Sequence, residues 1–162
     1  MFKALHSGAE GFTLVELVVI IVVLGILAAV AIPKLFDVSE EAEQASVEHM
    51  ISSLESALGI YSSKQFVNAD ALTVHNPFDD LSNTPSNYNG INDPVTPANT
   101  PDGTWSWRPS GNWIMYNPRQ PITGGWLNGG ERFIIYRVEV VLDGVDTVGL
   151  KLNTTPAYAY TW

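Results

Sequence analysis

The hydrophobic pattern divides the chain into an apolar start, an amphipathic stretch and a longer part without a sustained period. Residues 12–32 read FTLVELVVIIVVLGILAAVAI, where Glu16 is the only charge and Thr13 the only other polar side chain. A helix of about 20 apolar residues, at about 1.5 Å rise per residue, spans the hydrocarbon layer of a bilayer. The pattern therefore predicts a helix that lies in a membrane or inside a helical bundle.

An amphipathic helix is expected to continue this segment beyond Pro33. Apolar residues recur there at spacings of three and four, as in a helix that buries one stripe. The recurring positions are Leu35, Val38, Ala42, Ala45, Val47, Ile51, Leu54, Leu58 and Tyr61. We expect one protruding helix from Phe12 to about Tyr61, with Gly59 or the following Ser62-Ser63 pair loosening its end.

The rest of the chain predicts a loop-rich head. From Asn68 to Gly130 the sequence has no sustained period and is rich in Pro, Asn, Thr, Ser and Gly, but its large aromatic side chains favour an ordered region with a core. Residues 105–107 and 113–116 are the expected short strands.

A β-hairpin is predicted at the end of the chain. Residues 132–142 and 145–152 are separated by Asp143-Gly144, a two-residue turn signal. Alternate residues of the first strand are expected to face the amphipathic half of the helix: Ile134, Tyr136, Val138, Val140 and Leu142. The fold class is thus α+β, a long N-terminal helix packed on a small C-terminal antiparallel sheet.

Three interpretations of the apolar start remain open at this point. The segment could be a single transmembrane anchor, with Glu16 near one end of the span. It could be a secretory signal peptide cut after Ala29-Val30-Ala31, with Ile32 as the mature start. In the third interpretation, processing occurs in front of the apolar segment, between Gly11 and Phe12.

The residues around that third position resemble a known family. The string Gly11-Phe12-Thr13-Leu14-Val15-Glu16, the apolar run and then Ile32-Pro33-Lys34 are similar to the N-terminus of type IV pilins and of type II secretion pseudopilins. In that family a prepilin peptidase cuts after the glycine and methylates the new amino group, and the apolar helices pack as the filament core. The resemblance implies cleavage after Gly11, methylation of Phe12, and a long helix on a C-terminal antiparallel sheet.

Glu16 is the candidate assembly residue. A buried, unpaired carboxylate costs several kcal/mol, so at membrane or filament depth it needs a positive partner. The freed amino group of Phe12, on the same or a neighbouring chain, is the nearest candidate, and such pairing would set the axial register between subunits. Gly25 and Pro33 are the expected points of helix bending.

These observations predict four segments and a structural role. Residues 1–11 form a leader, 12–33 a transmembrane or filament-core helix, 34–64 its amphipathic second half, and 65–162 the head. The resemblance implies a precursor in the inner membrane, in contact with lipid, the prepilin peptidase and the assembly machinery. The mature protein is expected in a filament with copies of itself and other pilins, at the cell surface or in the periplasm. The alternatives are a type II secretion pseudopilin and a secreted or singly anchored surface binding protein.

Charge and cysteine content limit the other function classes. With 17 carboxylates against 8 Lys and Arg the formal charge is −9, which argues against nucleic-acid binding. The chain has no cysteine and hence no disulfide. Acidic residues gather after the apolar segment, and basic ones come later. They are Asp37, Glu40, Glu41, Glu43 and Glu48, and then Arg108, Arg119, Arg132 and Arg137. Two interpretations are open: these charges are solvated, or the acidic residues of one subunit pair with the basic residues of the next subunit in a stack.

Cofactor binding and catalysis find little support, and no cofactor is expected. Calcium would need oxygen ligands from aspartates whose spacing matches no EF-hand. These are Asp79, Asp80, Asp93 and Asp102. The histidines His6, His49 and His75 show no metal-ligand spacing, and the common nucleophile and phosphate-binding motifs are absent. Tryptophans beside Asn and Asp suit a glycan-binding surface or, alternatively, the core of a small sheet.

Overall fold

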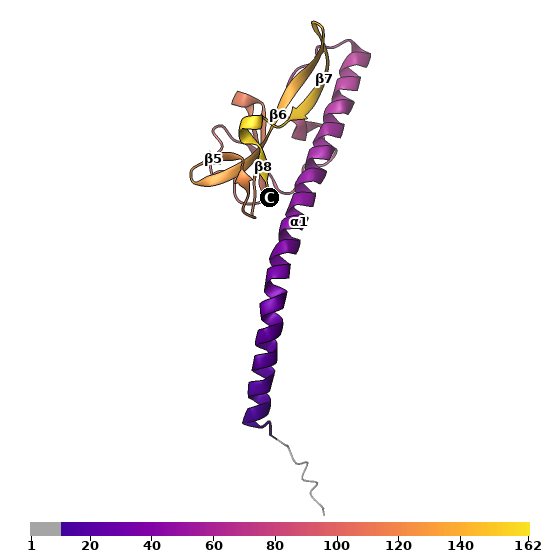
Figure 1. Ribbon diagram of the computed structural model, residues 1–162. Helices are drawn as coiled ribbons and strands as arrows, with labels where there is room; N and C mark the ends of the chain where they lie inside the picture. Colours follow the sequence, from indigo (N-terminus) through magenta and orange to yellow (C-terminus); the bar gives the residue numbers. More distant parts are fainter. Residues whose placement is uncertain (1–10) are drawn as a thin grey trace, which may run out of the picture. The chain divides into compact units, whose positions relative to one another are not determined.

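The computed structural model describes residues 11–162, which fall into two units, residues 11–39 and residues 40–162 (Figure 1). One helix, α1 (Leu14–Asn68), supplies most of the first unit and the beginning of the second. The predicted leader, apart from Gly11, lies outside the described residues.

The helix α1 ends at Asn68, seven residues after Tyr61 and four after the expected segment 34–64, so the expected loosening at Gly59 or Ser62-Ser63 was wrong. The hydroxyl groups of Ser62 and Ser63 donate to carbonyls one turn back, at 2.8 and 2.9 Å, and Ser62 is buried. Serines bonded in this way are accommodated within a helix. The helix instead stops where Ala69 takes a φ of 56° and the Asp70 N–H donates to the carbonyl of Gln65 at 2.9 Å, a Schellman closure.

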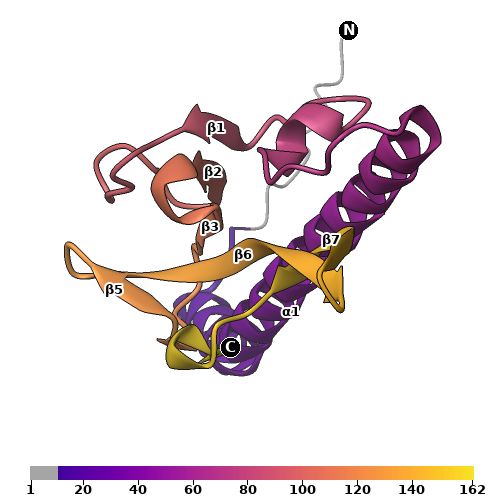
Figure 2. The same ribbon diagram turned by 90° about the horizontal axis from the view of Figure 1, so that it is seen from above.

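The second unit is a mixed sheet packed on the later part of α1, which confirms the α+β class (Figures 1 and 2). Its main sheet has the order β1-β2-β3-β6-β5 with β7 also paired to β6, while β4 and β8 form a separate pair. The strands are β1 (Tyr88–Ile91), β2 (Thr104–Arg108), β3 (Trp113–Asn117), β4 (Thr123–Gly124), β5 (Trp126–Asn128), β6 (Glu131–Asp143), β7 (Asp146–Asn153) and β8 (Tyr160–Thr161). Short 3₁₀ turns lie at Pro77–Asp80, Pro109–Gly111 and Pro156–Tyr158.

The two short strands predicted around the tryptophans are confirmed as the cores of β2 and β3. They pair antiparallel, with Trp105 opposite Tyr116. The pairing of β1 with β2 is parallel, so the sheet is not purely antiparallel as expected. Strands β1, β4, β5 and β8 are two to four residues long, too short for an alternating pattern to show in the sequence.

The predicted C-terminal hairpin is confirmed as β6 and β7, with its turn shifted by one residue. Asp143 pairs with Asp146, so the two-residue turn is Gly144-Val145. Gly144 takes a φ of 64°, which favours glycine at the first turn position. Val148 forms a bulge in β7, because Val141 pairs with Gly149 but the next residue of β6 pairs with Thr147.

The main core lies between α1 and one face of the sheet. Ile134, Tyr136 and Val138 of β6 join it as expected. The side chains of Val140 and Leu142 are 40% and 57% exposed, so that part of the expectation was wrong. The last buried residue of α1 is Ser62, and the hairpin extends past this core. The α1 residues in the core are Val47, Ile51, Leu54 and Leu58.

The other face of the sheet carries a smaller apolar cluster. Val95, Met115, Phe133 and Ile135 are buried there, and three half-buried aromatic residues pack against them. These are Trp113, Trp126 and Tyr158. Both faces of the small sheet are therefore covered, one by α1 and the other by loops.

Replacement of Leu58 by alanine tests the α1 contribution to the core. Leu58 is fully buried, and we expect the change to lower the free energy of unfolding by about 2–5 kcal/mol through lost burial and a cavity. The Ile60→Ala control, at a side chain 58% exposed, should change it by about 0.5 kcal/mol or less. Denaturant unfolding of the full chain in detergent, followed by tryptophan fluorescence, measures both; equal losses would contradict this view of the core.

Candidate functional site

The first turn of α1 is closed by a reciprocal capping box. The Thr13 hydroxyl accepts from the Glu16 N–H at 3.2 Å, and Glu16 Oε2 accepts from the Thr13 N–H at 3.1 Å and from its hydroxyl at 2.9 Å. Thr13 is the N-cap and Glu16 the third helical residue, the spacing at which both groups satisfy backbone donors that the helix leaves unpaired. Glu16 therefore has a structural role in the helix itself.

This capping box is also a signal that sequence reasoning missed. The residues Thr13 to Glu16 have the Thr-x-x-Glu spacing of a capping box directly before an apolar run. Our sequence interpretation assigned Glu16 to charge pairing alone. Because both bonds end on Oε2, Oε1 is left for a further donor, so a role in pairing remains a prediction alongside the role in capping.

The helix after the box presents an apolar surface on every side. Within residues 11–162, α1 is the one helix long and apolar enough to cross a membrane, and its most apolar stretch is entirely exposed. Signal sequences near an N-terminus share this length and composition. An apolar surface all round suits lipid or the interior of a helical bundle. The helix is continuous through Gly25 and Pro33, whose role in bending remains a prediction.

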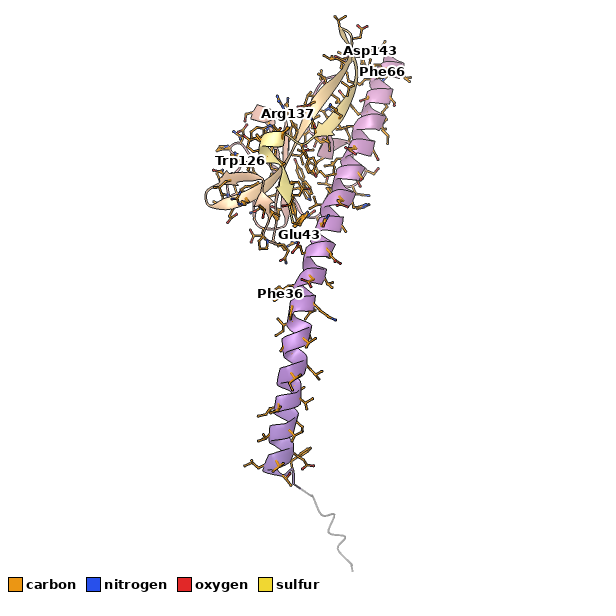
Figure 3. The ribbon with its side chains drawn as sticks, in the orientation of Figure 1. Phe36, Glu43, Phe66, Trp126, Arg137 and Asp143 are labelled. Carbon is orange, nitrogen blue, oxygen red and sulfur yellow. The ribbon has the colours of Figure 1, made fainter. Side chains whose placement is uncertain are left out.

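One residue of the acidic group after this segment is buried. Glu43 is only 8% exposed and belongs to the second unit. Its carboxylate accepts from the Tyr116 hydroxyl at 2.7 Å and from the backbone N–H groups of Arg119 and Gln120, each at 2.8 Å. Figure 3 shows Glu43 on the side of α1 that faces the sheet. Its expected solvation or pairing with another subunit was wrong, because its lone pairs are used inside the head.

The other acidic residues after the apolar segment stay accessible. Asp37, Glu41 and Glu48 are exposed and Glu40 is half-buried. Next to Glu43, burial and the hydrogen bond to its carboxylate raise the pKa of Tyr116 far above the usual value. Tyr116 thus stays a hydroxyl donor to Glu43 throughout the physiological range.

The arginines are engaged to different degrees. Arg108 lies 3.2 Å from Asp93 and stacks over the rings of Trp113 and Trp126, with its guanidinium carbon 5.0 and 5.8 Å from the ring centroids. Arg132 donates to the carbonyl of Gly124 at 2.7 Å. Trp113 and Trp126 themselves pack against the small apolar cluster on the sheet. This agrees with the expectation that the tryptophans fill the core of a small sheet.

The four aspartates considered as calcium ligands have separate partners. Asp79 accepts from Asn76, Asp80 lies 2.6 Å from His75, Asp93 pairs with Arg108, and Asp102 accepts from Asn117. Among the described residues no three acidic, histidine or cysteine side chains gather in the way a metal ion needs. His49 lies exposed on α1, and His6 is outside the described residues.

Asp93 makes a testable contribution to the pH dependence of stability. Hydrogen bonds from Ser110, then from Arg108, hold its pKa below the ordinary value of 3.8. A lowered pKa gives stability that is present above pH 3.8 and lost as the pH falls through the folded-state value. We expect wild type to be more stable than Asp93→Asn by a constant difference near neutral pH that shrinks below pH 3.8. Unfolding curves of both proteins across this range test it; a difference that grows in acid would contradict it.

Comparisons with known proteins find one family model at the N-terminus of the chain and several relatives that match part of it. The model of the prokaryotic N-terminal methylation motif matches residues 7–32, a range that contains Gly11, Phe12 and Glu16. The chain is 44% identical over 52 residues to a type IV narrow pilus major component of Thermus thermophilus. It is 47% identical over 52 residues to the type II secretion system core protein G of Pectobacterium carotovorum, and 45% over 51 residues to that of Vibrio cholerae.

These similarities cover a limited part of each protein. Each spans 32% of this chain, and they span 45% of the Thermus protein, 33% of the Pectobacterium protein and 35% of the Vibrio protein. No solved structure matches the chain significantly. The resemblance found in the sequence is confirmed where its motif lies, at residues 7–32, while most of the chain is not matched by these relatives.

Proposed function

Since its N-terminal segment carries the methylation motif of type IV pilins and type II secretion pseudopilins, we propose that this protein is a structural subunit of an extracytoplasmic pilus-like filament. The precursor is held in the inner membrane by α1. A prepilin peptidase cuts it after Gly11, Phe12 is methylated, and inner-membrane machinery assembles the subunits with one another and with other pilins. The match over residues 7–32 is the observation that carries this proposal.

The exposed apolar helix supports the same proposal on physical grounds. So large an apolar surface is unfavourable in water and needs lipid before assembly and neighbouring helices afterwards. A subunit that leaves the membrane for a filament exchanges one apolar environment for the other. Cleavage after Gly11 would free the amino group of Phe12, which stays positively charged when methylated and is available to Oε1 of Glu16 on the same or a neighbouring chain.

The type II secretion pseudopilin is the second candidate function. The core protein G relatives are as similar to this chain as the pilus component is, over the same length of sequence. Deletion of the gene distinguishes the two. Loss of shearable surface filaments supports the pilus, and accumulation of secreted proteins inside the cell supports the pseudopilin.

The N-terminus of the mature protein is the decisive measurement for the class as a whole. We expect Edman sequencing and intact mass of protein sheared from the cell surface to show a methylated Phe12 at the start. A start at Ile32 would indicate a secreted domain released by signal peptidase. An intact leader in the membrane fraction would indicate a plain anchor, and either result overturns the proposal.

A further inference from the structure

The last turns of α1 carry a shallow hollow that faces away from the sheet. It has a volume of about 600 Å³ and is lined by α1 alone, at Ser56, Gly59, Ile60, Ser63, Lys64, Val67 and Asn68. All of these residues are exposed, and Ile60 and Val67 show 58% and 86% of their surface. They lie on the side of the helix opposite the residues buried against the head. Its lining combines small residues, Ser56, Gly59 and Ser63, with the apolar Ile60 and Val67.

Gly59 at the centre of the hollow has no explanation within the subunit. It sits in the helix interior with ordinary helical geometry, where glycine costs about 1 kcal/mol relative to alanine. A Cβ built at this position would meet no atom within 4 Å. The missing side chain therefore relieves no contact inside the subunit, but it leaves room for a group that approaches from outside.

The tip of the β6–β7 hairpin has the complementary form. Val145 is 94% exposed at the turn and is flanked by the exposed carboxylates of Asp143 and Asp146. Neither aspartate forms an ion pair with any residue in the range 11–162, and the same holds for Lys64 in the hollow. The hollow is thus mainly apolar with one cation, Lys64, and the hairpin tip presents one apolar side chain, Val145, between two anions.

We propose that the hairpin tip of one subunit docks in the α1 hollow of the next, with Val145 over Gly59 and the two aspartates beside Lys64. A subunit cannot fill its own hollow, because the hollow and the hairpin lie on opposite sides of α1. Figure 3 shows Asp143 at the same end of the second unit as Phe66 of the last α1 turns, so a neighbour at a similar height brings the two surfaces together. Two different surfaces meet, and such a head-to-tail contact builds an open helical assembly when its rotation does not close a ring. This inference rests on the proposed filament.

The absence of cysteine allows a direct test by disulfide formation. The variant Val145→Cys with Ser63→Cys places one thiol on each surface of every subunit. In oxidised filaments we expect a ladder of covalent dimers, trimers and longer species on a non-reducing gel. The matched control is Val145→Cys with Ser46→Cys, since Ser46 is also an exposed α1 serine but lies outside the hollow. Docking should raise cross-linking at least about tenfold over this control, because it holds the thiols at high effective concentration.

The outcomes separate this contact from the proposed function. Filaments that form without a ladder above the control overturn the docking and leave the filament intact. Dimers from Ser63→Cys alone show that two hollows face each other, which also overturns it. Failure of the wild-type chain to give any filament removes the proposed function, and the docking with it.

Two further variants test the shape and the charge of the contact. Gly59→Leu fills the hollow without touching the head, and leucine is the better helix former, so the subunit should be at least as stable as wild type while filament yield falls about tenfold. Lys64→Glu should lower the yield similarly, and Asp146→Lys in the same chain should restore part of it. Full yield in Gly59→Leu, or no recovery in the charge exchange, contradicts the proposal.

Discussion

Replacement of Glu16 by alanine is expected to reduce filament yield by at least about tenfold while the precursor stays in the membrane. The change removes the carboxylate that would pair with the amino group of Phe12, and it also removes half of the capping box with Thr13. Immunoblots of sheared and membrane fractions measure the effect. The alanine variant alone does not show which lost interaction lowers the filament yield, because it removes the capping hydrogen bonds and the charge together.

Two companion variants separate these roles. Glu16→Gln keeps a side-chain oxygen for the Thr13 N–H, since glutamine serves at this position of a capping box, but it removes the negative charge. Thr13→Ala removes the N-cap side chain, at a cost of about 0.5–2 kcal/mol in helix stability, and keeps the charge. If charge pairing sets the register, Glu16→Gln fails like Glu16→Ala and Thr13→Ala assembles nearly normally. Normal filaments in Glu16→Gln would overturn the register hypothesis and leave capping as the role of Glu16.

The sequence predicted those features that depend on long or regular patterns. The apolar run, the three- and four-residue spacing up to Leu58 and the alternation in β6 each repeat many times, so the long helix, its buried stripe and the hairpin were predicted. The end of α1 was misplaced because Gly59 and two serines suggest a helix end in sequence, while the serine hydroxyls bond back to the helix carbonyls. Short strands such as β4 and β8 depend on tertiary pairing and leave no such pattern.

The site was predicted in part for a similar reason. The residues of the methylation motif are contiguous and could be identified directly, whereas the contacts of Glu43 join residues more than 70 positions apart. Nothing in the local sequence distinguishes Glu43 from Glu41, since both are acidic residues after the apolar segment. Only the fold shows that one faces the sheet and the other faces solvent.

That difference makes Glu43 the residue of α1 outside the core whose loss should most destabilise the head. Glu43→Ala would leave the Tyr116 hydroxyl and the N–H groups of Arg119 and Gln120 without their shared acceptor. Hydrogen bonds to a charged group contribute about 1.5–3 kcal/mol each, and the losses overlap, so we expect the free energy of unfolding to fall by about 3–5 kcal/mol. Unfolding of the full chain in detergent, followed by tryptophan fluorescence, reports on the head, where all five tryptophans lie.

Matched variants show whether this loss arises from the shared acceptor. Glu41→Ala, two residues earlier and exposed, should change the free energy of unfolding by about 0.5 kcal/mol or less. Glu43→Gln should lower the free energy of unfolding by an intermediate amount. Its amide oxygen still accepts a hydrogen bond, but its NH₂ group faces an N–H or O–H donor in place of the second carboxylate oxygen. A Glu43→Gln protein as stable as wild type would mean that one oxygen suffices to hold the 119–120 backbone. If Glu41→Ala and Glu43→Ala lower the free energy of unfolding equally, these glutamates act only through their negative charge. The buried hydrogen bonds of Glu43 would then not stabilise the packing of the head on α1.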